Sequence, residues 1–169
     1  MKRFLSILLA CLLLSGCGQQ AGETKITEPS DGSIGIESNA GDDTIMESGN
    51  QIFLTVNGQT LTATLAENSS AEALKELLAQ GPLTISMRDY GSMEKVGDIG
   101  TDLPANDEQI TTEAGDLILY MGSAFVIYYA PNSWNFTRLG KIDNITAQEL
   151  KDLLGGGDVQ VTLTMNTKS

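Results

Sequence analysis

Apolar residues recur at every second position along much of the chain after residue 50, which is the pattern of half-buried strands. Such runs extend from Ile52 to Val56 and from Leu61 to Leu65, on either side of Asn57-Gly58. An Asn-Gly pair tolerates the positive φ angles that a type I′ turn requires at both central positions. The pattern therefore predicts a β-hairpin at the start of a folded region.

Further short apolar runs, separated by turn residues, predict strands over the rest of the chain. The predicted strands cover residues 83–87, 95–99, 116–121, 124–130, 138–142 and 159–165. Strands do not alternate regularly with helices, so a parallel sheet is not expected. Many short strands with few helices favour a closed barrel or a sandwich.

Two segments have the spacing of short amphipathic helices. The first has a capping box over 69–72, a stripe of leucines and a stop at Gly81-Pro82. The second has a capping box over 146–149, a similar stripe and a glycine run at 155–157. Because these glycines follow a helix rather than precede one, they are interpreted as a helix end and not as a phosphate-binding loop.

The first residues predict a secretory signal. Lys2 and Arg3 precede an apolar run, 4–14, that is too short for a stable membrane anchor. The run ends at Leu14-Ser15-Gly16-Cys17, which resembles the lipobox of bacterial lipoproteins. The resemblance implies a signal peptide over 1–16 and fatty acylation of Cys17, of the palmitate type. It implies a protein anchored by lipid to the cell membrane and facing the extracytoplasmic side.

Composition divides the remaining chain into two parts. Residues 17–50 are rich in Gly, Ser, Asp and Glu with scattered apolar residues, which predicts a disordered acidic tether. Residues 51–169 have the length of a single domain with its own core.

The charge balance limits the partners. The chain has 10 basic and 22 acidic residues and a net charge of −12; loss of Lys2 and Arg3 with the signal would leave 8 basic residues and a net charge of −14. Such a chain lacks the cations that nucleic acid or anionic lipid headgroups require. Contact with the membrane is therefore expected through the lipid alone.

Missing residue types limit the chemistry. The sequence has no histidine, which excludes Ser-His-Asp catalysis and His-ligated zinc. Cys11 would leave with the signal and Cys17 would be acylated, so no disulfide or redox thiol is expected. No metal site and no cofactor is predicted.

Five segments in sequence order resemble a bacterial cyclophilin-like family, which includes small free proteins and lipoproteins. They are VNGQTLTATL, DYGSMEKVGDI, TTEAGDLILYMG, FVIYYAPNSW and FTRLGKI, and the resemblance covers nearly all of 51–165. It implies a mainly β fold: a closed cyclophilin-like barrel of about eight strands with a short helix over each end.

True cyclophilins are peptidyl-prolyl isomerases that hold an X-Pro peptide on the outer face of the barrel, where an arginine polarises the prolyl amide. The segment RLGKI, 138–142, resembles one of their strands, and a tryptophan precedes that strand in both, so the resemblance places Trp134 at a ligand groove. Their Phe-His-Arg run has its nearest counterpart in SMRDYG, with Arg88 but without the histidine. The paired aromatics of their Gln-Phe-Phe segment are only echoed by SAFVI, 123–127.

The candidate ligand-contacting residues each have a structural alternative. Trp134 and Phe136 are two apart and share one face of a strand, either in the core or as a wall for a flat ligand. Arg88 and Arg138 either form ion pairs, with Asp89, Glu94 or Asp143, or donate to a ligand carbonyl or carboxylate. Residues 133–142 are expected to be a loop followed by a strand, with the loop as the binding part.

The predicted function is binding of a peptide, including a proline-containing one, or a small ligand, without an assigned catalytic residue. One alternative is a peptidyl-prolyl isomerase for exported proteins, which requires an arginine facing an apolar groove beside an aromatic ring. Another is a purely structural envelope protein without a groove. The predicted rim of the site consists of Trp134, Phe136, Arg138, Tyr90, Tyr129 and Arg88.

Overall fold

The computed structural model describes residues 49–166, which form antiparallel strands and two helices. The strands are β1 Gln51–Val56, β2 Gln59–Leu65, β3 Leu83–Tyr90, β4 Glu94–Asp98, β5 Glu108–Thr111, β6 Asp116–Tyr120, β7 Ala124–Tyr128, β8 Ser133–Ile142 and β9 Val159–Thr164. The helices are α1 Ser69–Ala79 and α2 Ala147–Leu154. The predicted signal peptide, Cys17 and nearly all of the tether lie outside the described residues and stay predictions. No helix within 49–166 is long and apolar enough to cross a membrane.

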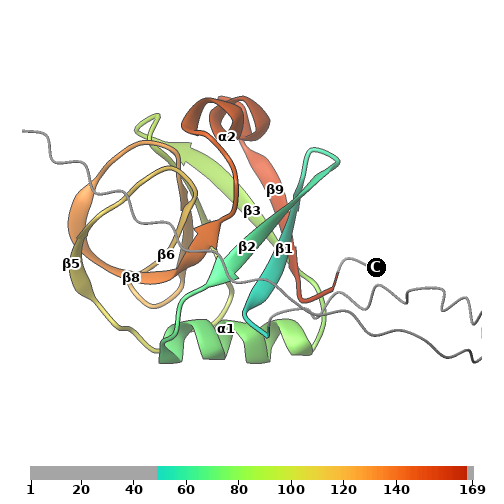
Figure 1. The fold of residues 1–169 in the computed structure, drawn as a ribbon, viewed down its shortest axis with the longest axis vertical. Coiled ribbons are helices and arrows are strands. Elements are labelled where there is room, and N and C mark those ends of the chain that lie inside the picture. The colour runs from blue at the N-terminus through green and yellow to red at the C-terminus, as the bar shows by residue number, and fades with distance from the viewer. Residues whose placement is uncertain (1–48, 167–169) are drawn as a thin grey trace, which may run out of the picture. The chain divides into compact units, whose positions relative to one another are not determined.

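Eight strands close into a barrel, as the sequence predicted (Figure 1). Their order is β2-β1-β9-β3-β4-β7-β6-β8, and the pairing of β2 with β8 completes the ring. All pairs are antiparallel. The remaining strand, β5, pairs only with the first half of β8 and lies outside the ring.

The closing pair brings two backbones unusually close. Gly140 of β8 lies opposite Leu65 of β2, and a Cβ at Gly140 would lie 2.5 Å from the carbonyl oxygen of Thr64. Only glycine fits such an approach. The glycine of the RLGKI segment therefore serves the closure of the barrel.

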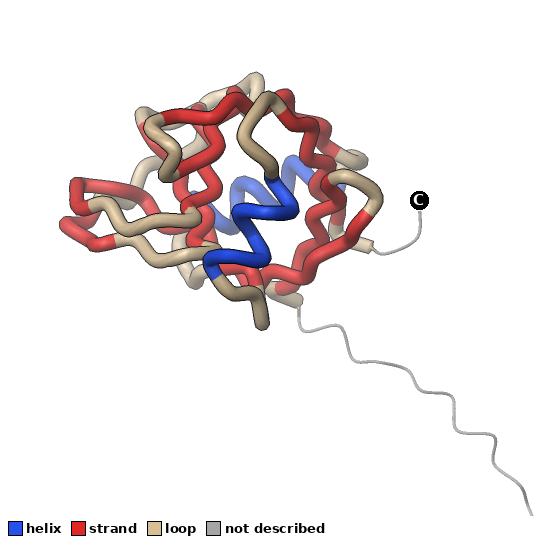
Figure 2. The backbone as a smooth tube through the Cα atoms, turned by 90° about the horizontal axis from the view of Figure 1, so that it is seen from above, coloured by secondary structure: helices blue, strands red, loops and turns tan. Residues whose placement is uncertain are grey.

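The helices cover the two ends of the barrel, α1 at the bottom and α2 at the top of the view in Figure 1. Figure 2 shows both helices across the opening of the ring of strands. Leu74 and Leu78 of α1, and Leu150 and Leu154 of α2, are buried in the main core. Burial of each leucine contributes about 1.5–3 kcal/mol relative to exposure.

Most of the turns and helix caps predicted from local sequence are present in the structure. Asn57 and Gly58 have φ angles of 49° and 79°, as a type I′ hairpin requires. Thr146 and Glu149 form the predicted capping box of α2. For α1 the prediction was one residue late: the N-cap is Asn68, whose side chain accepts from the backbone N–H of Ala71.

Two predictions about strands were wrong. Strand β5 was not predicted, because its sequence EQIT has no apolar alternation and it forms only by pairing with β8. The segment Ser133–Ile142 is one continuous strand, not a loop followed by a strand. The pairing with β5 extends β8 back to Ser133, so Trp134 lies within a strand.

Apolar side chains form two separate clusters. The main core fills the barrel and receives inward-facing residues of every barrel strand except β4. A smaller cluster, made of Ile118, Val126, Tyr128 and Phe136, lies on the opposite face of β6, β7 and β8. The wall of the barrel is therefore apolar on both faces at these strands, and the outer cluster forms the floor of the cleft described next.

Candidate functional site

A cleft of about 440 Å³ lies on the outer face of the barrel, over the small apolar cluster. Strands β3, β4, β6, β7 and β8 provide nearly all of its walls. The lining residues are Arg88, Tyr90, Glu94, Val96, Tyr120, Ala124, Val126, Tyr128, Asn132, Trp134 and Phe136. They combine an apolar floor with a few polar groups, which is the usual make-up of a small-ligand site.

Strand alternation directs these side chains outward. Along β7, Phe125 and Ile127 enter the main core, whereas Val126 and Tyr128 belong to the outer cluster. Successive side chains of a strand point to opposite faces. The same rule on β3 buries Met87 and leaves Arg88 exposed in the cleft.

Aromatic rings dominate the cleft. Three of the four tyrosines and the only tryptophan line it, although aromatic residues make up 5% of the chain. The ring of Phe136 lies 5.6 Å from that of Tyr128 and 6.1 Å, edge to face, from that of Tyr120. Trp134 and Tyr90 are 60% and 61% exposed. Large exposed rings beside a buried aromatic floor offer a stacking surface to a ligand.

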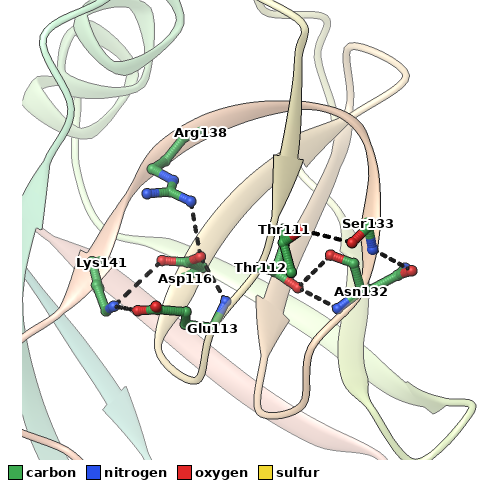
Figure 3. Close-up of polar contacts among 8 residues, drawn as sticks. All are labelled: Thr111, Thr112, Glu113, Asp116, Asn132, Ser133, Arg138 and Lys141. Atoms are coloured by element: carbon green, nitrogen blue, oxygen red, sulfur yellow. Dashed lines mark hydrogen bonds and ion pairs between the residues drawn. The ribbon is translucent and has the colours of Figure 1, made fainter. Parts of the chain in front are cut away.

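The end of the cleft at Asn132 is fixed by hydrogen bonds between the segments that flank β5 and β8 (Figure 3). The backbone N–H of Asn132 donates to Thr112 Oγ1 at 2.9 Å, and the N–H of Thr112 donates to the carbonyl of Asn132 at 2.7 Å. The hydroxyls of Thr111 and Ser133 are 2.7 Å apart. These contacts position the start of β8 and hence Trp134.

Arg88 is the only cation among the lining residues of the cleft. It lies on β3 opposite Val96 of β4. No carboxylate within residues 49–166 pairs with it. Its guanidinium is therefore available to donate to a carbonyl or carboxylate in the cleft.

Glu94 is an acid buried in the same cleft, with 8% of its surface exposed. Its Oε2 atom has no hydrogen-bond partner among the described residues. Burial raises the pKa of the Glu94 carboxyl, and a hydrogen bond from Tyr128, its cross-strand partner, opposes this rise. An incompletely satisfied buried carboxyl is costly for the fold alone.

Tyr128 connects Glu94 to the floor of the cleft. Its hydroxyl accepts a hydrogen bond from Asn132 Nδ2 at 3.2 Å. Burial, and next the bond to Glu94, raise the pKa of Tyr128 well above its usual value, so the hydroxyl stays protonated and can donate. The cleft thus contains a cation, a buried acid and a tyrosine hydroxyl within aromatic walls.

The structure brings four of the six predicted rim residues together, namely Trp134, Phe136, Tyr90 and Arg88. Tyr129 points the other way, into the barrel, where its hydroxyl donates to Asp89. Burial, and next the bond to Asp89, raise the pKa of Tyr129. Tyr129 therefore lies on the face of the sheet opposite the cleft.

Arg138 is engaged in an ion pair outside the cleft (Figure 3). Its Nη2 lies 3.1 Å from Oδ2 of the fully buried Asp116, which was not among the partners considered from sequence. The same carboxylate oxygen accepts from the N–H of Glu113 at 2.9 Å. Arg138 thus forms an ion pair, the structural role considered for it from sequence, but its partner is Asp116.

Several lining residues were not predicted, including Glu94, Tyr120, Tyr128 and Asn132. The signal that was available is the paired Tyr128-Tyr129 at the end of β7, of which one side chain must face outward. Sequence alone does not tell which one, because both faces of β7 are apolar. Within residues 49–166 no group of three or more His, Cys, Asp and Glu residues is arranged to hold a metal ion.

A closed antiparallel barrel with a helix over each end and an arginine-containing cleft on its outer face defines a cyclophilin-type architecture. Residues 54–164, more than half of the chain, match the Cyclophilin-like family, and the chain belongs to that family. The sequence has no match among curated proteins.

A similar fold occurs in a hypothetical protein from Archaeoglobus fulgidus whose structure was determined in solution. The two chains are 14% identical, with a TM-score of 0.51, and the match covers 70% of this chain and 95% of that one. At this identity the likeness concerns the fold alone.

Proposed function

We propose that this protein binds a peptide or another small ligand in the cleft on the outer face of the barrel, while a lipid on Cys17 holds it on the extracytoplasmic side of the cell membrane. The observation that carries the binding proposal is the position of Arg88, without an ion-pair partner in the described part of the chain, at an aromatic cleft. This also argues against a purely structural role, which predicts no groove.

The chemistry of the cleft suits a peptide. The guanidinium of Arg88 donates to a backbone carbonyl, and the rings of Trp134 and Phe136 pack against an apolar side chain such as proline. A volume of about 440 Å³ accommodates a few residues rather than a folded partner. Short peptides with proline are therefore the first ligands to test.

A second candidate function, peptidyl-prolyl isomerisation, is favoured by one observation. Arg88 shares an apolar groove with Trp134, which is the arrangement that the resemblance to true cyclophilins requires. Rotation about the prolyl amide has a barrier of about 18–20 kcal/mol, which falls when a donor stabilises the twisted amide. In this role Arg88 donates to the prolyl amide while the rings hold the pyrrolidine.

Trp134 provides a direct test of binding, because it is the only tryptophan in the chain and lines the cleft. We expect proline-containing tetrapeptides to shift the fluorescence of the purified full chain in a saturable way. Arg88→Ala should weaken binding about tenfold, whereas Lys151→Ala, which removes an exposed cation elsewhere, should not. Equal affinity in both variants would exclude Arg88 as a ligand contact.

Catalysis is tested separately by NMR exchange spectroscopy on an Ala-Pro peptide with catalytic amounts of the full chain. Cis–trans exchange peaks that disappear in Arg88→Ala and persist in Lys151→Ala would establish the isomerase. Binding without exchange would leave a barrel that holds the peptide without the reaction.

The anchor is tested in cells through Cys17. Labelled palmitate should be incorporated into the wild-type chain and not into Cys17→Ala, and the variant should leave the membrane fraction. Incorporation into Cys17→Ala would contradict the proposed attachment site.

A further inference from the structure

Glu94 is an unusual residue for the floor of an aromatic cleft. It is more than nine-tenths buried, lines the cleft, and has an Oε2 atom without a hydrogen-bond partner in the described chain. Buried carboxyl groups in folded proteins are normally paired or fully hydrogen-bonded. The protein therefore leaves this acid incompletely satisfied at a place where a ligand would lie.

The strands around Glu94 do not supply a cation in contact with it. Tyr90 and Arg88 face the cleft from β3, Tyr128 from β7 and Tyr120 from β6, and none of them forms an ion pair with Glu94. Arg88 is opposite Val96, about 7 Å along β4 from Glu94. The cation and the acid thus mark two different positions in the cleft.

Lys95, the next residue in the chain, cannot neutralise Glu94. Its side chain is fully buried on the other face of β4, where it donates to Asp89 Oδ1 and to the carbonyl of Gly157. Consecutive residues of a strand point to opposite faces. No lysine or arginine of residues 49–166 therefore pairs with Glu94, which leaves that position open to a cation of the ligand.

The aromatic walls, like the carboxyl of Glu94, favour a cationic ligand. Tyr90, Tyr120, Tyr128, Trp134 and Phe136 surround the cleft, and a cation over the face of such rings is stabilised by their quadrupoles. Acidic residues also outnumber basic ones more than twofold in the chain, which attracts cations at long range.

We propose that the cleft binds a cationic nitrogen, an ammonium or guanidinium, against Glu94 within the aromatic walls, while Arg88 takes a carbonyl of the same ligand. The inference rests on the proposed ligand-binding function and names its ligand class. Two sources have this chemistry: a peptide with a Lys or Arg side chain, and a small free amine.

The test compares two peptides that differ in one charge. The acetylated and amidated tetrapeptides Ala-Lys-Pro-Ala and Ala-norleucine-Pro-Ala are titrated into the full chain at low salt, with Trp134 fluorescence as the signal. We expect the lysine peptide to bind at least fivefold more tightly at pH 7.5. Glu94→Gln should abolish this preference, whereas Glu76→Gln, an equal charge loss on the exposed side of α1, should retain it.

The preference should also depend on pH. Because the pKa of Glu94 is raised by burial, the carboxyl loses its charge before an exposed acid does as the pH falls. The lysine preference should decline on acidification in the wild type and in Glu76→Gln, and Glu94→Gln should show no such decline. Circular dichroism confirms that each variant is folded before titration.

The outcomes separate this inference from the proposed function. Equal binding of both peptides would overturn the inference and leave the binding cleft standing, whereas binding of neither would overturn both. If Glu94→Gln still prefers the lysine peptide, the preference comes from the overall negative charge of the protein, and the inference is also overturned. A lysine preference that depends on Glu94 supports it. Titration with 6-aminohexanamide, a small amine that also has a carbonyl, then identifies the source: equal affinity indicates a small amine, and much weaker affinity a peptide.

Discussion

The inner and outer faces of β3, β4 and the end of β7 carry the same kinds of polar residue in different surroundings. On the inner face, Lys95 Nζ lies 3.0 Å from Asp89 Oδ1 and 2.8 Å from the carbonyl of Gly157, and the Tyr129 hydroxyl donates to the same carboxylate. The residues that directly precede Asp89, Lys95 and Tyr129 in the chain point outward into the cleft. The outward set is Arg88, Glu94 and Tyr128.

The comparison separates polar residues that pair with one another from polar residues that face the cleft. Each set has one cation, one acid and one tyrosine, so residue type does not distinguish them. The inner groups satisfy one another and support the end of the barrel near α2, whereas Glu94 and Arg88 are not ion-paired within residues 49–166. We therefore expect changes to the inner set to affect folding, and changes to the outer set to affect ligands.

The largest effect on stability should come from Lys95→Met. It removes the cation from Asp89 and preserves most of the buried apolar volume, so we expect a loss of about 2–4 kcal/mol in the free energy of unfolding. Urea denaturation of the full chain measures this loss. Glu94→Gln should change the same quantity by less than about 1 kcal/mol; equal losses in the two variants would remove the distinction between the faces.

A smaller loss should come from Tyr129→Phe. It removes the hydrogen bond to the Asp89 carboxylate, and bonds to charged groups contribute about 1.5–3 kcal/mol. The matched change on the outer face, Tyr128→Phe, removes the acceptor of Asn132 at 3.2 Å and the hydrogen bond to the Glu94 carboxyl. Because burial disfavours the charged form of Glu94, that bond is weaker than the bond to Asp89, and we expect about half the loss. Thermal or urea unfolding of both variants provides the comparison, and a larger loss for Tyr128→Phe would reverse it.

The two acids should give opposite dependences on pH. The bonds from Tyr129 and Lys95 hold the pKa of Asp89 below 3.8, so Asp89 stabilises the fold above that pH and this contribution is lost as the pH falls through the lowered value. Burial raises the pKa of Glu94 above 4.5, so the fold loses stability as the pH rises through the raised value.

Unfolding free energies measured between pH 4 and pH 8 separate these contributions. The stability of Glu94→Gln relative to the wild type should increase with pH. For Asp89→Asn, the deficit relative to the wild type should diminish only toward the acidic limit. A constant difference for Glu94→Gln across the range would mean that its carboxyl is not perturbed.

The smallest effect on stability should come from Arg88→Ala. Arg88 is exposed and has no ion-pair partner in the described region, so we expect a change within about 0.5 kcal/mol. The same variant should bind proline-containing peptides about tenfold more weakly, as measured by Trp134 fluorescence. A clear loss of stability would show that Arg88 supports the fold.

The parts of the fold that local signals determine were predictable from sequence. The hairpin at Asn57-Gly58 depends on two positive φ angles, and the start of α2 on the reciprocal bonds of Thr146 and Glu149. Both signals lie within four consecutive residues. Strand β5 has no such signal and depends on a partner more than twenty residues later in the chain.

The cleft was only partly predictable for a related reason. Burial of both faces of β7 hides which of Tyr128 and Tyr129 points outward. The two arginines offered the same options in sequence, and only the position of the buried Asp116 assigns Arg138 to an ion pair. Arg88, Trp134 and Phe136 were found because the family resemblance and the strand spacing indicated them.

The pairing of β1 with β9 makes the first and last strands of the barrel neighbours in space. Phe53, near the start of β1, lies opposite Thr164, near the end of β9. The chain therefore enters and leaves the barrel at neighbouring positions. A short peptide joining residue 166 to residue 50, with new termini opened at Asn57-Gly58, should give a permuted chain that retains the same strand order and the same cleft.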